Sequence, residues 1–158
     1  MNQTHSKVAP GLLIDLESRG LVHEYSDPSL GRMLDSAPMT LYCGFDPTAD
    51  SLHAGHLIPL LTLARFQKYG HHPIVVMGGG TGMIGDPSGR NKTRPQITMS
   101  ETRDNAKSYI EQASIILAEE NLTIVYNSEW LGKMEFSDVI KLSSKYTVAR
   151  MLERDDFT

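Results

Sequence analysis

The sequence predicts an α/β fold in which crossover helices connect the strands of a parallel sheet, preceded by an N-terminal helix. Three short apolar segments, at residues 41–45, 73–77 and 122–126, are typical of buried strands. Helical patterns separate these segments, and such alternation favours a parallel sheet. The 158 residues are 40% hydrophobic and 22% charged, which is typical of a globular chain with a core of its own.

The remaining elements follow from the spacing of apolar and turn-forming residues. Residues 7–20 have the pattern of an amphipathic helix that Gly20 ends. Residues 21–39 are predicted to be irregular, because they contain Asp27-Pro28 and Gly31. Further helical patterns cover residues 53–69, 100–119 and 136–156, the last in two or three short pieces.

Composition and charge exclude several classes of protein. The net charge is -4 and the pI about 5.8, without the basic excess that is usual for a nucleic-acid-binding domain. The apolar runs are too short to span a bilayer, and no secretory signal begins the chain. Cys43 is the only cysteine, so no intramolecular disulfide can form. We therefore expect a cytoplasmic protein.

Residues 41–57 contain the first chemical motif, a strand followed by an Asp46-Pro47-Thr48 turn and a helix that begins near His53 and His56. A helix N-terminus presents N–H groups that bind anions, so this segment suits a nucleotide triphosphate. Two alternatives are that the histidines only cap the helix, or that they bind zinc. Zinc is disfavoured, because no cysteine or third histidine lies nearby in the sequence.

The second motif is the glycine-rich segment 78–89. Residues 80–85 match G-x-G-x-x-G after a strand, but Asp86-Pro87 follows at once and prevents the long helix of a dinucleotide-binding unit. The same two residues stand where a P-loop has lysine and a hydroxyl residue. A purely structural turn remains possible from the residues alone. The basic residues Arg90, Lys92 and Arg94 that follow are, taken alone, typical of a solvated loop.

Both motifs resemble a known family. Residues 42–56 resemble the first signature of tyrosyl-tRNA synthetases, which are class I aminoacyl-tRNA synthetases, with Ala54 in place of isoleucine in the class pattern His-Ile-Gly-His. Residues 78–88 resemble the family's second segment, Gly-Gly-x-Thr-Gly-x-Ile-Gly-Asp-Pro-Ser. The resemblance implies an N-terminal helix and irregular segment at 1–39, the first half of a Rossmann-like fold at 40–126, and the start of a connective, dimerising insertion at 127–158.

The resemblance implies an ATP site with Mg²⁺ carried by the nucleotide and no tightly bound protein metal. Thr48 and His53 would contact the terminal phosphates, and His56 would lie near the ribose and the α-phosphate. Gly55 would allow the adenine to lie against backbone. The complete expected set of ATP-binding residues is Cys43, Gly44, Asp46, Thr48, His53, Gly55 and His56.

It also implies a tyrosine site and cations for the leaving pyrophosphate. Tyr42 would bind the phenolic hydroxyl of tyrosine and thereby select tyrosine, because a polar group left unpaired in the site would disfavour phenylalanine. Asp86, with Thr81 nearby, would bind the α-ammonium group, and Asp46 would line the junction with the ATP site. Arg90 and Arg94 would bind pyrophosphate and complete a catalytic set with Thr48, His53 and His56.

The resemblance implies activation of tyrosine by ATP, transfer to tRNA(Tyr), and a homodimer for the full-length protein. The chain ends at Thr158 without the family's Lys-Met-Ser-Lys-Ser-like loop. We therefore expect an N-terminal part of a longer synthetase, with little activity alone and with its main tRNA-binding region elsewhere. The alternative is a stand-alone nucleotide- or tyrosine-binding module. His71 and His72 are interpreted as loop residues without chemistry, and Trp130 as a packing anchor.

Overall fold

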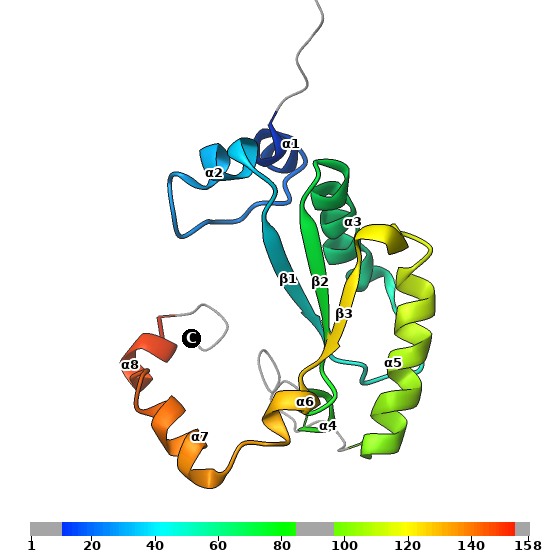
Figure 1. Cartoon of the computed structure of the whole chain (residues 1–158), viewed down its shortest axis with the longest axis vertical. Coiled ribbons are helices and arrows are strands. Elements are labelled where there is room, and N and C mark those ends of the chain that lie inside the picture. The colour runs from blue at the N-terminus through cyan, green and yellow to red at the C-terminus, as the bar shows by residue number, and fades with distance from the viewer. Residues whose placement is uncertain (1–10, 85–96, 154–158) are drawn as a thin grey trace, which may run out of the picture. The chain divides into compact units, whose positions relative to one another are not determined.

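The computed structural model describes residues 11–84 and 97–153. Its sheet has three strands in the order β1-β2-β3, with β1 at Thr40–Phe45, β2 at His72–Met77 and β3 at Thr123–Tyr126. The strands run in the same direction (Figure 1), and their chain order is their order in the sheet. Helix α3 (Ala54–Lys68) connects β1 to β2, and α5 (Met99–Ala113) lies between β2 and β3. The predicted α/β fold with a parallel sheet is confirmed.

The chain forms two compact units, and the sequence passes repeatedly from one to the other. The first unit contains the described residues 11–43, 53–74 and 113–123. The second contains the described residues 44–52, 75–84, 97–112 and 124–153. Each strand contributes residues to both units, so each unit has its own part of the sheet.

The core of the first unit is an apolar cluster between two short helices, α1 (Leu12–Ser18) and α2 (Leu30–Ser36). Leu12, Leu16 and Leu34 are buried together there. The prediction that residues 21–39 are irregular is wrong, because α2 lies within them. The Asp27-Pro28 turn begins this helix: the Asp27 carboxylate accepts from the Ser29 N–H at 2.7 Å. A side chain at Gly31 would come within 3.1 Å of Leu13, so glycine permits close packing here.

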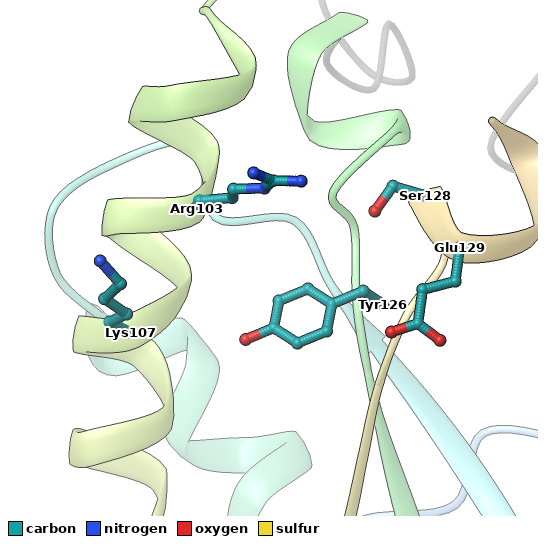
Figure 2. Close-up of a pocket in the computed structure, with 5 residues that line it drawn as sticks. All are labelled: Arg103, Lys107, Tyr126, Ser128 and Glu129. Carbon is teal, nitrogen blue, oxygen red and sulfur yellow. The ribbon is translucent and has the colours of Figure 1, made fainter.

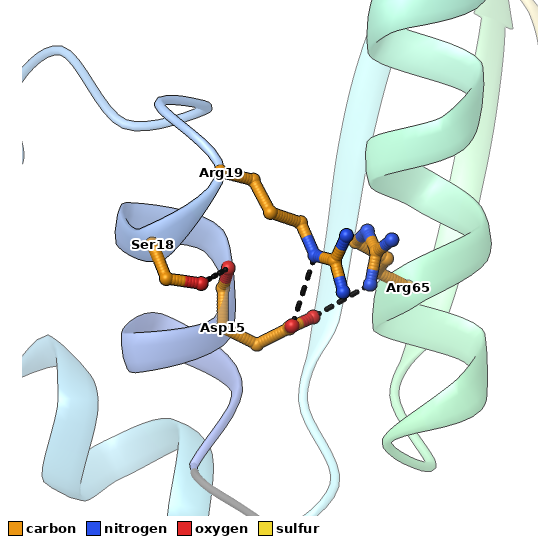
Figure 3. A network of polar contacts seen from close by, with 4 residues as sticks. All are labelled: Asp15, Ser18, Arg19 and Arg65. Carbon is orange, nitrogen blue, oxygen red and sulfur yellow. Dashed lines mark hydrogen bonds and ion pairs between the residues drawn. The ribbon is translucent and has the colours of Figure 1, made fainter.

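An ion-pair network fastens α1 to α3 within this unit (Figure 3). One oxygen of the Asp15 carboxylate contacts Arg19 Nε at 2.9 Å, and the other contacts Arg65 Nη1 at 2.7 Å. Burial raises the pKa of Asp15, but the hydrogen bonds and charges of the two arginines outweigh it, so the net shift of the pKa is downward. The carboxylate therefore remains charged and paired on a largely buried surface.

His71 is buried, with 2% of its surface exposed, and has a structural role. Its Nδ1 accepts a hydrogen bond from the Met39 N–H at 3.0 Å, and its ring meets Phe66 edge-on at a centroid distance of 5.7 Å. Burial, with the neighbouring His72 charge, lowers the pKa of His71, although Asp35 opposes this. His71 lies in the connection before β2, as predicted, whereas His72 is the first residue of the strand.

The second unit packs α5 against its part of the sheet, with Thr102, Ala106 and Tyr109 almost completely buried. The prediction that this helix reaches residue 119 is wrong, because α5 ends at Ala113 and a short 3-10 helix follows at Glu119–Asn121. In the first unit, the Gln67 side-chain amide bonds to both the N–H and the C=O of Ala118, at 2.9 and 2.8 Å. These bonds hold Ala118 in extended backbone, which prevents continuation of the helix.

Short helices complete the second unit. Helix α4 (Thr81–Ile84) lies within the segment predicted as a glycine-rich turn, so that prediction is wrong for these four residues. Helices α6 (Ser128–Leu131), α7 (Phe136–Ser143) and α8 (Val148–Met151) follow β3, and the last two confirm the predicted short helical pieces. Trp130 is 46% exposed, so its interpretation as a packing anchor is wrong. In the described part of the chain, no helix has the length and apolar character needed to cross a membrane.

Candidate active site

The N-terminus of α3, in the first unit, carries the two motif histidines as a reciprocal cap. His53 is the N-cap residue, and its Nδ1 accepts from the Gly55 N–H at 3.1 Å. The Nδ1 of His56 accepts from the His53 N–H, also at 3.1 Å. The two rings lie with centroids 3.9 Å apart and an interplanar angle of 32°. Both histidines therefore cap the helix, and this role does not exclude contact with a ligand.

The cap also determines what the imidazoles can offer to a ligand. A ring nitrogen that accepts a hydrogen bond carries no proton, so each neutral ring has its proton on Nε2. Burial, together with the charge of His53, lowers the pKa of His56, which favours this neutral form at physiological pH. His53 is exposed and His56 half-buried. The pair can therefore act as Nε2–H donors at a helix end that already favours anions.

Gly55 is required by the cap itself. A Cβ atom at this position would lie 2.9 Å from Cε1 and 3.0 Å from Nδ1 of His53. Real Cβ atoms do not approach a ring this closely, so any larger residue would displace the His53 side chain. The glycine thus keeps the ring over the first turn of α3.

Residues of β1 alternate between exposed and covered positions. The side chain of Tyr42 is 77% exposed, whereas Cys43 is half-buried. Burial raises the pKa of the Cys43 thiol, so it remains protonated near neutral pH. A Cβ atom at Gly44 would meet no other atom within 4 Å, so the space beside this backbone is open.

In the second unit, two polar residues and a glycine directly follow the ends of the strands. Asp46 follows β1, Gly78 follows β2 and Asn127 follows β3. Because the strands are parallel, these positions share the carboxyl edge of the sheet, where α/β proteins bind their ligands. A side chain at Gly78 would overlap the Asp46 carboxylate, so the glycine leaves room for that group.

A chain of hydrogen bonds joins this edge to the start of α4. The Thr81 hydroxyl donates to Asp46 Oδ1 at 2.7 Å and accepts from Asn127 Nδ2 at 2.8 Å. The Asn127 side-chain oxygen accepts from the Gly80 N–H at 2.8 Å. Asn127 is buried, with 9% of its surface exposed, and therefore anchors this series of hydrogen bonds. One oxygen of Asp46 is held in place and its charge is presented at the sheet edge.

Thr48 lies in the turn after Asp46, and its N–H donates to the Asp46 carbonyl at 2.8 Å. Pro47 between them is fully buried, and its carbonyl accepts from Asn105 Nδ2 at 3.0 Å. The turn is therefore fastened to α5 on one side, which fixes the half-buried Thr48. No group of three or more histidine, cysteine, aspartate or glutamate side chains is placed to hold a metal ion in the described ranges.

Comparison with known proteins identifies the family. The family model described as "tRNA synthetases class I (W and Y)" matches residues 34–158. The chain belongs to this family of class I tRNA synthetases. Among curated relatives, the Tyrosine--tRNA ligase of Chlorobaculum tepidum is 50% identical over 149 residues, which are 91% of this chain and 37% of the relative. That of Deinococcus radiodurans is 44% identical, over 100% of this chain and 39% of the relative.

Solved structures agree with the class I synthetase fold. A C-terminally truncated mitochondrial tyrosyl-tRNA synthetase of Aspergillus nidulans has a TM-score of 0.77 at 30% identity, over 93% of this chain and 46% of that one. The counterpart from Coccidioides posadasii has a TM-score of 0.71 at 26% identity, over 93% and 44%. The chain thus spans less than half the length of these relatives and structures.

Within this class I synthetase, the structure places the expected site residues in separate groups. His53, Gly55 and His56 form the helix cap of the first unit, and Asp46 is joined to Thr81 in the second. Asp86, Arg90 and Arg94 lie outside the described residues, as does Lys92. Asn127 was missed as a site residue, although its position directly after a strand of a parallel sheet was a usable signal.

Proposed function

We propose that this chain contributes the tyrosine- and ATP-binding part of a tyrosyl-tRNA synthetase. The tyrosine carboxylate attacks the α-phosphorus of ATP, the bond to the β-phosphate breaks, and pyrophosphate leaves with the bonding electrons. A hydroxyl group of tRNA(Tyr) then attacks the carbonyl carbon of the tyrosyl-adenylate, the bond to the phosphate breaks, and AMP leaves as the tyrosyl group is transferred. The observation that carries the proposal is the reciprocal His53–His56 cap, which supplies two Nε2–H donors at an anion-binding helix end. The curated relatives' name, Tyrosine--tRNA ligase, supports tyrosine as the amino acid.

ATP, with its Mg²⁺ ion, is a substrate in this proposal. Thr48 and His53 bind the terminal phosphates, and His56 donates near the ribose and the α-phosphate. Cys43 and Gly44 border the ribose, and the open space beside Gly44 suits this position. Such a reaction needs no nucleophile from the protein. The barrier is lowered by alignment of the two substrates and by donors placed where charge develops.

Tyrosine binds through groups at both of its ends. The exposed Tyr42 side chain is available for the phenolic hydroxyl, and the Asp46 carboxylate, held by Thr81, lies at the junction of the two substrates. Asp86 binds the α-ammonium group, a cation for which a carboxylate is the natural partner. Arg90 and Arg94 neutralise the departing pyrophosphate.

The segment from α7 to α8 is proposed as the beginning of a homodimer interface in a cytoplasmic enzyme. Large apolar side chains are exposed along it, among them Phe136 at 79%, Ile140 at 55% and Val148 at 70%. Exposed apolar surface of this extent is typical of surfaces that another protein covers. The main tRNA-binding region is proposed to lie outside this chain.

Tyrosine-dependent exchange of pyrophosphate into ATP tests the proposed function. It is measured on the whole product of the reading frame that encodes this chain, with His56→Ala and with His72→Ala as the matched control. Loss of one donor to a developing charge lowers the rate by roughly 100-fold or more. We expect this loss for His56→Ala and none for His72→Ala, whose side chain is exposed on β2. Equal rates for both variants would contradict the assignment.

A further inference from the structure

A cavity in the second unit is lined by residues to which the proposed reaction gives no role. It has a volume of about 260 Å³ and lies in the second unit, between α5 and the end of β3 (Figure 2). Its lining residues come from α5, from β3 and from α6: Arg103, Lys107, Tyr126, Ser128 and Glu129. Its size and its concentration of polar groups suit a small charged molecule.

The two cations on α5 differ in what they have available for a ligand. Arg103 and Lys107 are four residues apart and therefore share one face of the helix. Lys107 Nζ contacts the Asp104 carboxylate at 2.9 Å, and this hydrogen bond and charge raise the pKa of Lys107. Among the described residues no carboxylate forms an ion pair with Arg103, whose guanidinium points toward Ser128 (Figure 2). Of the two cations, Arg103 is therefore the one without a carboxylate partner among the described residues.

The opposite wall offers a negative charge and two hydroxyl groups. Glu129, on α6, has no ion-pair partner among the residues described and lies on the far side of the Tyr126 ring from Lys107 (Figure 2). The Tyr126 hydroxyl points toward α5. Ser128 packs against Gly79, where an added Cβ atom would come within 2.7 Å of its hydroxyl oxygen. The backbone around the wall is therefore fixed, because Asn127 between these residues is buried and hydrogen-bonded.

The cavity thus presents one available cation and one available carboxylate on different helices, and the two do not pair with each other. We propose that it binds a small zwitterion, with the ligand carboxylate on Arg103 and the ligand ammonium on Glu129. A guanidinium holds a carboxylate through two parallel hydrogen bonds, and a carboxylate is the matching acceptor for an ammonium group. Arg103 and Glu129 enter the cavity from opposite sides (Figure 2), so we expect a ligand with separated charges to fit better than an α-amino acid.

Calorimetric titration with 6-aminohexanoate tests the proposal, with its amide, its N-acetyl derivative and glycine as comparison ligands. The intact chain is expected to bind 6-aminohexanoate at least tenfold more tightly than any of the three, since a hydrogen bond to a charged group has this effect. The Arg103→Gln variant is expected to bind 6-aminohexanoate and its amide with equal affinity. The Glu129→Gln variant is expected to bind 6-aminohexanoate and its N-acetyl derivative with equal affinity. Lys141→Ala removes an exposed cation on α7 and is expected to change neither comparison.

All three substituted side chains are exposed, so the variants should retain the fold, and circular dichroism verifies this. Amide chemical shifts of Ser128 and Glu129 locate the bound ligand. The proposal is overturned if 6-aminohexanoate binds no more tightly than its two neutralised derivatives. It is also overturned if Arg103→Gln and Lys141→Ala weaken binding equally, because that result would indicate a general charge effect.

Discussion

The Thr81 hydroxyl donates a hydrogen bond to the Asp46 carboxylate at 2.7 Å, across 35 residues of sequence. Thr81 in turn accepts from the buried Asn127, so a carboxylate at the sheet edge is positioned from the interior. In the proposed reaction this carboxylate stands where tyrosine and ATP meet. Its orientation therefore depends in part on Asn127, a buried residue that has no proposed contact with either substrate.

Thr81→Val should weaken tyrosine binding, because valine keeps the shape of threonine but cannot donate to Asp46. A hydrogen bond to a charged group contributes about 1.5–3 kcal/mol, so the dissociation constant should rise by about tenfold or more. Equilibrium dialysis with labelled tyrosine measures it. Thr62→Val is the control, since the Thr62 hydroxyl donates to the Ile58 carbonyl of its own helix. Unchanged binding in Thr81→Val would show that Asp46 does not need this donor.

Asn127→Ala should destabilise the second unit. The substitution leaves the part-buried Gly80 N–H without its Asn127 partner and removes one of the two hydrogen bonds of the Thr81 hydroxyl, and each lost hydrogen bond costs about 0.5–1.5 kcal/mol. Urea unfolding followed by circular dichroism should show a lower midpoint. Asn121→Ala, at an exposed residue of the 3-10 helix, should leave the midpoint unchanged. Equal midpoints for the two variants would exclude Asn127 as the anchor.

Gly55→Ala should disrupt the histidine cap, because the new methyl group and the His53 ring would occupy the same space. Loss of an N-cap typically costs about 1 kcal/mol of stability. Thermal unfolding should therefore occur at a lower temperature, and ATP binding should weaken because both Nε2–H donors move. For comparison, Gly44→Ala should not lower the unfolding temperature, since its Cβ has open space. A stable Gly55→Ala variant that binds ATP normally would contradict the cap geometry.

Stability should fall as pH falls below about 6.5, the ordinary pKa of histidine. The pKa of His71 is lowered in the folded chain, so between the two pKa values the unfolded chain binds more protons. The free energy of unfolding therefore rises with pH across this window and is fully restored above it. His56 contributes with the same sign.

Unfolding free energies of the parent chain and of His71→Asn, measured from pH 5 to 8, test whether His71 causes this pH dependence. Asparagine can still accept the Met39 N–H but does not titrate, so the slope against pH should be smaller in the variant. His23→Asn, at an exposed histidine, should retain the parent slope. If His71→Asn retains it as well, the buried imidazole is not the source.

The sequence predicts those parts of the fold that depend on local pattern. Apolar runs located all three strands to within one residue at each end, because buried parallel strands are continuously apolar. It also located the histidine cap, whose members lie three residues apart. The extended backbone at Ala118, which lies within the predicted helix, could not be predicted, because Gln67 bonds to it across 51 residues of sequence. The position of Asn127 directly after a strand was a usable signal, but its bonds could not be predicted, since Gly80 and Thr81 are 47 and 46 residues away.

The central claim is that this chain forms part of an enzyme that activates tyrosine with ATP. Amino-acid-dependent exchange of pyrophosphate into ATP, by the whole product of its reading frame, tests this most directly. Tyrosine and tryptophan are the informative pair, because the family includes synthetases for both. We predict exchange with tyrosine, little with tryptophan, and none without an amino acid. Exchange that is faster with tryptophan, or that tyrosine does not stimulate, would contradict the account.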